Sequence, residues 1–427
     1  MAKYLTVILI LIVALSALPG ASAQETTELT FWTFVDAHAV FMEAQAERWN
    51  EANPDRPIEI VSTVTPYEEM HDALLLSLVS GTGAPDLADI EIAKFPNFMQ
   101  GDIQLVELTD VIEPYRDSLV ETRLLPYSTG GSFYGIDYHI GTFVMYYNTA
   151  VMEEAGVDID SIVTWDDYIA AGQQVTADTD GDGEIDRWMT TVETTDRFSA
   201  LGLMLQNGGG IYNADGELIL DSAENAEALQ FVGDLVNVHE IATPSPGGLH
   251  HDEGYYANMN NGMYGSVWMP QWYMIRFTDF MPDLEGNIVV RPMPVFEEGG
   301  FTSTMGGGTG TAITAQTPEA EQELAKEFLG FAKLSYDSNV LIWTELGFDP
   351  LNAEVYSDPA LAEPLPYFGN ESVFTTISEI QSNLAPEYLG PLYADAVELL
   401  RTTTIFDVVV NGVSADEALA NTVSQLD

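Results

Sequence analysis

The sequence predicts an α/β protein folded into two domains, and three observations lead to this class. Short runs rich in β-branched and aromatic residues alternate with helical runs, which favours a sheet of parallel strands covered on both faces. About 400 residues follow the N-terminal segment, which is too long for a single hydrophobic core. Hydrophobic residues make up 46% of the chain and aromatic residues 11%, enough for two packed domains.

Glycine and capping residues delimit the predicted elements. Gly81 and Gly83 end the second helix, because glycine readily adopts the backbone conformations that terminate helices. Ser222 is a suitable N-cap for a later helix, and Pro318 stands at the first helical position of another. The alternating elements at the start are a strand over 29–33, a helix over 38–53, a strand over 57–64, a helix over 68–80 and a strand over 86–90.

The first residues have the pattern of a cleavable secretory signal. A single cation, Lys3, precedes an apolar stretch over 5–18, and the small residues Ala21-Ser22-Ala23 follow. The stretch is shorter than the about 20 residues needed to span a bilayer. We therefore expect a signal peptide at 1–23 and no membrane-spanning segment in the mature protein.

The chain contains no cysteine, so neither a disulfide nor a lipid anchor on an N-terminal cysteine can form. These features predict a freely diffusing, monomeric protein of the periplasm. Its 13 basic and 67 acidic residues give a net charge of −54, which repels nucleic acid and anionic membranes. Concentrated salt would screen the self-repulsion, so we expect a saline habitat.

One acidic motif has the spacing of a calcium-binding loop. Asp178, Asp180, Asp182 and Asp186 occupy positions one, three, five and nine, and Gly183 occupies position six. Position twelve is not glutamate, so a later acid such as Glu193 would have to supply the last ligand. The motif predicts a structural Ca²⁺ site, with an Asp/Gly-rich turn as the alternative; no other cofactor is expected.

Several segments, in order along nearly the whole mature chain, carry a resemblance to one known family. They are 31–33 with Asp36, 83–87, 134–137, 145–148, 163–167, 261–272, 306–308, the helix after Pro318, 346–350 and 415–419. These segments resemble the family 1 extracellular solute-binding proteins, the maltose-binding-protein-like carriers of ABC importers. Each match is weak alone, but the ordered set is specific. Asp137 departs from the family, which often has proline there.

The resemblance implies a two-lobe periplasmic-binding-protein fold with a hinge crossed several times and a ligand cleft between the lobes. It implies lobe one at 24–136 and 296–349, lobe two at 142–295 and 350–427, and hinge segments near 137–141, 294–304 and 348–352. It also implies a function: capture of a sugar outside the cytoplasm and delivery to the membrane permease of an ABC importer, without catalysis.

A neutral sugar needs flat apolar surfaces, and tryptophan supplies such a surface together with an N–H donor. We expect Trp32, Trp268 and Trp272 to be candidate platforms for the sugar rings. Trp268 and Trp272 are four residues apart with a proline between them, so they do not form one helical stripe. Core packing is the alternative role for each of the three.

The expected hydroxyl acceptors are Asp36, Glu91 and Asp137, which lie near the carboxyl ends of predicted strands, where open parallel sheets bind ligands. His139 could donate to a hydroxyl, and Gly307 could let backbone N–H groups approach the ligand. Surface or structural roles are the alternatives.

Two other function classes stay open at this point. A carbohydrate-active enzyme would need a pair of carboxylates, and the chain has many acids. The second open class is a carrier for a polyol, a peptide or a glycerol phosphate, although the chain has few cations to hold phosphate. The cations that could enter a cleft are Lys94, Arg197 and Arg276.

Overall fold

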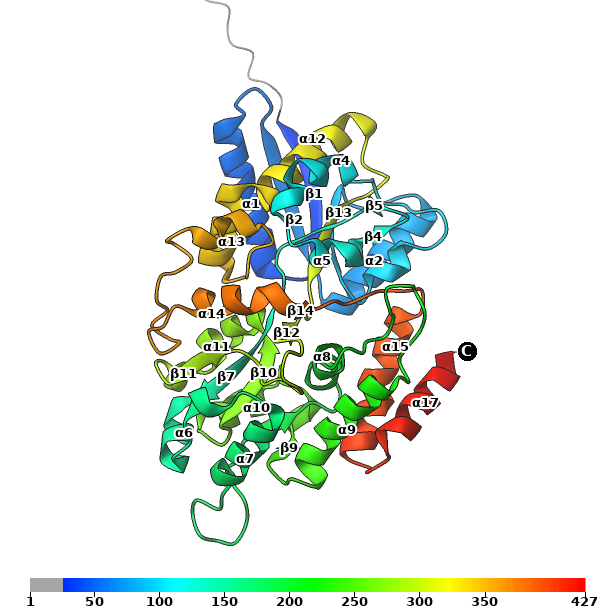
Figure 1. Ribbon diagram of the computed structural model, residues 1–427. Coiled ribbons are helices and arrows are strands. Elements are labelled where there is room, and N and C mark those ends of the chain that lie inside the picture. The colour runs from blue at the N-terminus through cyan, green and yellow to red at the C-terminus, as the bar shows by residue number, and fades with distance from the viewer. Residues whose placement is uncertain (1–25, 427) are drawn as a thin grey trace, which may run out of the picture.

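The computed structural model describes residues 26–426, so the proposed signal peptide at 1–23 lies outside the described residues. The described chain forms two lobes, one above the other in Figure 1. We call lobe one the part packed around a five-stranded sheet, and lobe two the part packed around a three-stranded sheet. Within 26–426, no helix combines the length and the apolar character needed to cross a membrane.

Lobe one has five strands in its sheet, a small hairpin and helices on both faces. The sheet strands are β1 (Thr27–Thr33), β2 (Ile58–Val64), β3 (Leu87–Glu91), β6 (Ile136–Asp137) and β13 (Thr309–Ile313). The hairpin strands are β4 (Ser128–Thr129) and β5 (Ser132–Phe133). The helices are α1 (Asp36–Ala52), α2 (Tyr67–Ser80), α3 (Phe95–Phe98), α4 (Thr109–Ile112), α5 (Glu121–Leu124), α12 (Glu319–Leu329) and α13 (Tyr336–Leu346).

The sheet of lobe one has the order β2-β1-β3-β13-β6. Strands β1, β2 and β3 run parallel, as the alternation predicts, but β13 is antiparallel to both β3 and β6. The prediction of a parallel sheet is therefore correct only for the first three strands. Strand β13 belongs to chain that returns to lobe one from lobe two, and it crosses the sheet in the opposite direction.

Both faces of this sheet are covered, because alternate residues of each strand point to opposite sides. Leu29 and Phe31 join one core with residues of α1 and α12, whereas Trp32 packs towards the other core with residues of α2. Helices α1, α12 and α13 lie together on one side of the lobe in Figure 1. Helix α12 begins at Glu319, so Pro318 is its N-cap and not its first residue.

Lobe two contains a larger core with more helices. Its three-stranded antiparallel sheet has the order β10-β7-β11, built from β7 (Phe143–Asn148), β10 (Ser266–Pro270) and β11 (Ile288–Arg291). Two strand pairs add β8 (Thr190–Val192) with β9 (Ala242–Pro244), and β12 (Ser303–Thr304) with β14 (Leu384–Ala385). The helices are α6 (Thr149–Ala155), α7 (Trp165–Val175), α8 (Phe198–Gln206), α9 (Ala223–Asn237), α10 (Glu253–Asn260), α11 (Met274–Phe280), α14 (Val373–Ile380), α15 (Tyr393–Leu399), α16 (Ile405–Val409) and α17 (Ala415–Leu426).

Three segments that connect the lobes lie against one another. Thr142 pairs with Met305 in one isolated β-bridge, and His139 pairs with Pro350 in another. The backbone N–H of Gly306 also donates to the Gly141 carbonyl at 2.9 Å. These contacts bring the predicted hinge regions together, while the lobe boundaries predicted from the resemblance stay a proposal.

Two buried aspartates hold these crossing segments. Asp349 accepts the backbone N–H of Gly141 at 2.9 Å and of Thr142 at 3.0 Å, together with the Thr142 hydroxyl at 2.7 Å. Asp137 accepts the N–H of Tyr138 at 2.7 Å and of Thr309 at 3.2 Å. Each carboxylate thus joins segments that are far apart in sequence.

Candidate ligand site between the lobes

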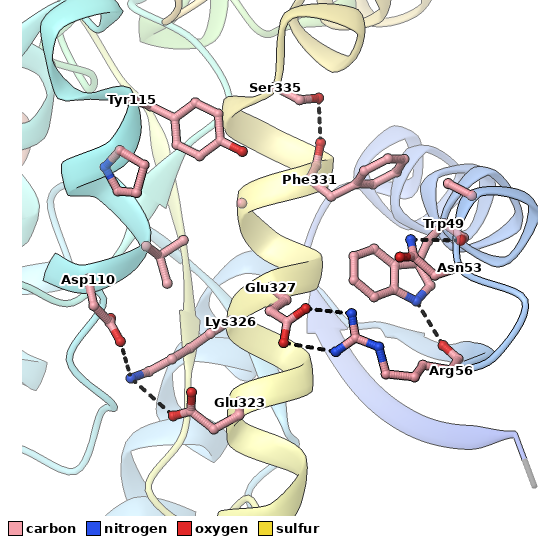
Figure 2. Close-up of a pocket in the computed structure, with 14 residues that line it drawn as sticks. Trp49, Asn53, Arg56, Asp110, Tyr115, Glu323, Lys326, Glu327, Phe331 and Ser335 are labelled. Carbon is pink, nitrogen blue, oxygen red and sulfur yellow. Dashed lines mark hydrogen bonds and ion pairs between the residues drawn. The ribbon is translucent and has the colours of Figure 1, made fainter.

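The described structure has a hollow on the outer surface of lobe one, with an empty volume of about 930 Å³ (Figure 2). The charged side chains that line it pair with one another. Arg56 makes two bonds to Glu327, at 2.9 and 2.7 Å, and Lys326 donates to Asp110 at 3.0 Å. Arg56, Glu327 and Asp110 are exposed, so the hollow resembles a solvated surface groove more than a ligand site.

A second pocket lies between the lobes and has an empty volume of about 250 Å³. This volume includes space that is open to solvent, and the enclosed space is far below the about 300–1,000 Å³ that is typical of small-molecule sites. Its walls come from lobe one, from the hinge and from lobe two, and they are mostly apolar. The residues that matter here are Ile92, Gly307, Arg197, Phe198, Glu387 and Tyr393.

A buried ion pair joins the two lobes beside this pocket. Arg197, the N-cap of α8 in lobe two, donates to Glu91 at the end of β3 in lobe one, with 2.8 Å between Nη2 and Oε1. Both side chains are only 10% exposed. The other Glu91 oxygen accepts the Tyr67 hydroxyl at 2.9 Å and the Ala93 N–H at 2.8 Å. Glu91 is therefore occupied by protein partners.

Aromatic rings form the side of the pocket next to the hinge. The guanidinium of Arg197 lies 4.7 Å from the centre of the Phe198 ring. Phe198 in turn meets Trp272 edge to face at 5.3 Å, and His251 stacks on Trp272 at 5.6 Å and 14°. The Trp272 indole packs against the cores of both lobes, and its N–H donates to the Gly306 carbonyl at 2.9 Å.

The acid that lines this pocket is Glu387, on the segment between β14 and α15. Its Oε1 accepts the hydroxyl of Tyr393, the first residue of α15. Burial raises the pKa of the Glu387 carboxyl, and the Tyr393 hydrogen bond and the charges of Arg123 and Arg197 offset this only in part. The pocket thus combines an aromatic wall, a guanidinium and a buried carboxyl.

The structure places Asp137 and His139 in the hinge region and not on the pocket surface. Asp137 is fully buried and lies 2.7 Å from Nε of Arg123, and it also accepts the Tyr127 hydroxyl. The His139 ring packs against Phe348 at 4.7 Å, and burial lowers its pKa to about 3, so the ring is neutral. Partners from the protein take the place of the ligand contacts expected of Asp137.

The other tryptophans and Asp36 also lie away from the pocket. Trp268 is fully buried in the core of lobe two, where its indole N–H donates to the Ser199 carbonyl at 3.2 Å. Trp32 is half-buried against the second core of lobe one, and Asp36 is exposed at the first position of α1. We accordingly leave these three residues out of the proposed site.

Of the expected site residues, Gly307 and Trp272 lie together beside the pocket. Gly307 has a φ of +66°, and a Cβ there would lie 3.1 Å from Nε1 of Trp272, so any side chain would meet the indole. The sequence analysis missed Phe198, Glu387 and Tyr393. A signal for Phe198 in the sequence is its place directly after Arg197, at the start of the mostly apolar run 198–205. No comparable pattern marks Glu387.

The acidic motif forms an exposed loop between α7 and β8. Carboxylate oxygens of Asp178, Asp180 and Asp186 lie within 4.8 Å of one another, whereas Asp182 is outside this group. Asp178 also accepts the backbone N–H of two glycines in the loop, at 2.6 and 2.8 Å. Glu193 does not join them, because it is buried and accepts the N–H groups of Ser199 and His250. Burial raises the pKa of Glu193 to about 8.

The two lobes and the pocket between them define a binding protein that can enclose a small ligand. Residues 33–334 match the family model described as bacterial extracellular solute-binding protein. The chain belongs to this family. It is a solute-binding protein and not an enzyme, which confirms the predicted class.

Two relatives are similar over almost the whole chain. An arabinooligosaccharide-binding protein of Halalkalibacterium halodurans is 45% identical, covering 92% of this chain and 86% of its own. A protein of the same description from Bacillus subtilis is 43% identical, covering 95% of both chains. Among solved structures, the sugar-binding protein MalE from Xanthomonas citri superposes with a TM-score of 0.77 at 17% identity, covering 94% of this chain and 96% of that chain. This likeness confirms the two-lobed fold.

Proposed function

We propose that this solute-binding protein captures arabino-oligosaccharides between its lobes and delivers them to the membrane permease of an ABC importer. The observation that carries the proposal is identity above 40%, over more than nine-tenths of the chain, to two proteins described as binding arabino-oligosaccharides. The pocket chemistry supports the same class of ligand. Aromatic rings suit the apolar faces of a sugar, and buried polar groups suit its hydroxyls.

The hinge supports a mechanism of capture by closure. Separate cores make each lobe a rigid body, and the crossing segments are the connections about which the lobes can rotate. The pocket is small in this structure, so the ligand would enter while the lobes are further apart and would be enclosed as they close again. Trp272, which touches both cores, would follow this motion, and we propose it as a ligand platform together with Phe198.

Arabinotriose is expected to raise the thermal midpoint of the purified mature protein and to bind saturably in calorimetry. A ligand that binds only the folded state adds RT ln(1 + [L]/Kd), about 2.7 kcal/mol at a hundredfold excess over Kd. Lactose, maltotriose, glycerol 3-phosphate and arabitol serve as comparisons. A larger shift with any of these, and none with arabinotriose, would contradict the proposed ligand.

We further propose that the protein is secreted through the signal at 1–23 and works as a periplasmic or otherwise extracytoplasmic monomer. The extracellular family supports export. The absence of cysteine from the sequence supports a protein without an N-terminal lipid, and its net charge of −54 supports function in saline surroundings.

The acidic loop is proposed to hold a structural Ca²⁺, because carboxylate oxygens are the ligands this ion prefers. Asp178, Asp180 and Asp186 would supply oxygens directly, and Asp182 would join if its side chain turned inward. The loop is closed by a β-bridge between Ala177 and Arg187, so an ion there would strengthen the connection between α7 and β8. The proposal is supported by the short separation of Asp178, Asp180 and Asp186, which are three of the four predicted ligands.

Ca²⁺ at 1 mM is expected to raise the thermal midpoint of the wild-type protein and to have no effect on an Asp178→Asn, Asp180→Asn double variant. Mg²⁺ controls for general screening of the negative charge, since it prefers stricter octahedral geometry. Sugar affinity should be the same in both proteins, because the loop is remote from the pocket residues. If the two ions shift the thermal midpoint equally, or if Ca²⁺ shifts it equally in both proteins, the effect is charge screening and the proposed Ca²⁺ site is wrong.

A further inference from the structure

The segment that carries Glu387 runs along the boundary between the lobes. It leaves β14, which pairs with β12 near the hinge, and leads to α15 (Figure 1). Leu389, two residues further on, packs against the core of lobe two and against one core of lobe one. Glu387 is therefore held beside both lobes, and its side chain lines the pocket between them.

The carboxylate of Glu387 has fewer protein partners than other buried acids. Among residues 26–426, its one hydrogen bond comes from the Tyr393 hydroxyl to Oε1. By contrast, Asp89 accepts from Thr33, His38 and Thr311, which fills most of its acceptor positions. A carboxylate offers about four acceptor positions, and a buried one with unmet positions is costly.

This comparison indicates that Glu387 is kept for a partner outside the protein. The residue is only 4% exposed, so water solvates it much less than it solvates a surface acid. A donor that enters between the lobes would reach Glu387, because this residue lines the pocket there. Such a donor, bonded to Oε2, would supply the contacts that Asp89 obtains within the fold.

We propose that Glu387 is a ligand-binding residue, whose free carboxylate oxygen accepts hydroxyl groups of a sugar ring packed against Phe198. The inference rests on the proposed function and deepens it by naming the acceptor in the pocket. The Tyr393 hydroxyl, which donates to Oε1, orients the carboxylate. Carboxylate–hydroxyl bonds are charge-assisted and are stronger than bonds between neutral groups.

The charges around the pocket favour a neutral ligand with several hydroxyls. The charges of Arg123 and Arg197 lower the pKa of the Glu387 carboxyl, and the charge of Glu91 raises it. The two guanidinium groups and the two carboxylates balance one another, so neither a cationic nor an anionic ligand gains from the net charge around the pocket. A neutral hydroxyl group bonds to Glu387 without altering this balance, which matches the sugar class proposed above.

The test compares Glu387→Gln with wild type and with Glu379→Gln, which makes the same change of charge at an exposed position of α14. We expect Glu387→Gln to weaken arabinotriose binding in calorimetry by about tenfold or more. The thermal midpoint of the ligand-free variant should stay the same or rise, because the change removes an under-bonded buried charge. Glu379→Gln should bind as wild type does.

A lowered midpoint of ligand-free Glu387→Gln would indicate a structural role and would overturn the inference, as would unchanged affinity. If Glu387→Gln does not fold, the Glu387→Asp variant tests the inference, because it keeps the charge but withdraws it from the pocket. It should bind more weakly, and wild-type affinity would overturn the inference. If wild type itself binds none of the sugars, the proposed function fails, and the role of Glu387 in it fails too.

Discussion

Replacing Asp137 by asparagine is expected to lower the free energy of unfolding by about 3–5 kcal/mol, because it leaves Arg123 buried without a counter-charge. Arg123 is fully buried, and its other bonds go to the carbonyl oxygens of His139 and Gly307. Neither carbonyl carries a full charge that could replace the carboxylate. The Asp137 carboxylate also accepts the backbone N–H of Thr309, so its replacement would loosen the contact between the crossing segments.

The same residue makes stability depend on acid. Burial alone would raise the pKa of Asp137, but the charge of Arg123, with further help from the Tyr127 hydroxyl, lowers it to about 2. Because the folded pKa is below the unfolded value of about 3.9, this stabilisation is present above pH 4 and is lost as the pH falls towards 2.

Urea unfolding of wild type, Asp137→Asn and Asp279→Asn between pH 2 and 7 measures both effects. Asp279 is exposed on α11, so its substitution makes the same change of charge without touching the hinge. Asp137→Asn should show a smaller loss of stability between pH 4 and 2 than the other two proteins. A change below 1 kcal/mol at pH 7 would show that Arg123 finds other compensation.

Much of the fold follows from local sequence patterns. The strands and helices of the first ninety residues are found within two residues of their predicted positions, since hydrophobic periodicity and glycine stops mark them clearly. Strand β13 was not predicted. Its sequence over 309–313, TGTAI, contains glycine and two threonines, and all five residues are buried between β3 and β6. Contacts with neighbours far away in sequence make it a strand.

The site was harder to predict, because the role of a side chain depends on which face of its element it occupies. Trp268 lies within β10 and points into a core, whereas Trp272 follows the end of that strand and reaches the lobe boundary. In the sequence, Asp137 has the position expected of a ligand acceptor, but in the structure its carboxylate pairs with Arg123. Glu387 lies outside any periodic pattern, so only its three-dimensional surroundings distinguish it among 67 acids.

Replacing Arg197 by methionine is expected to weaken sugar binding by about 30-fold or more, mainly through faster release. Removing one partner of a buried, hydrogen-bonded charge pair costs about 2–5 kcal/mol, and 1.4 kcal/mol corresponds to tenfold in affinity. The pair with Glu91 forms between the lobes, so its loss disfavours the closed state that encloses the ligand. Stopped-flow release rates and calorimetry would measure this effect.

A double-mutant cycle separates the interlobe pair from direct contact between Arg197 and the ligand. If the pair acts as a unit, adding Glu91→Gln to Arg197→Met costs little more, and the coupling energy exceeds about 1.5 kcal/mol. Arg187→Met is the control, since Arg187 pairs with Glu154 on the surface of lobe two alone. The energy of a bond that holds two rigid bodies together can be lost only once, so the two substitutions should not be additive. Additive effects would show instead that Arg197 acts directly on the ligand.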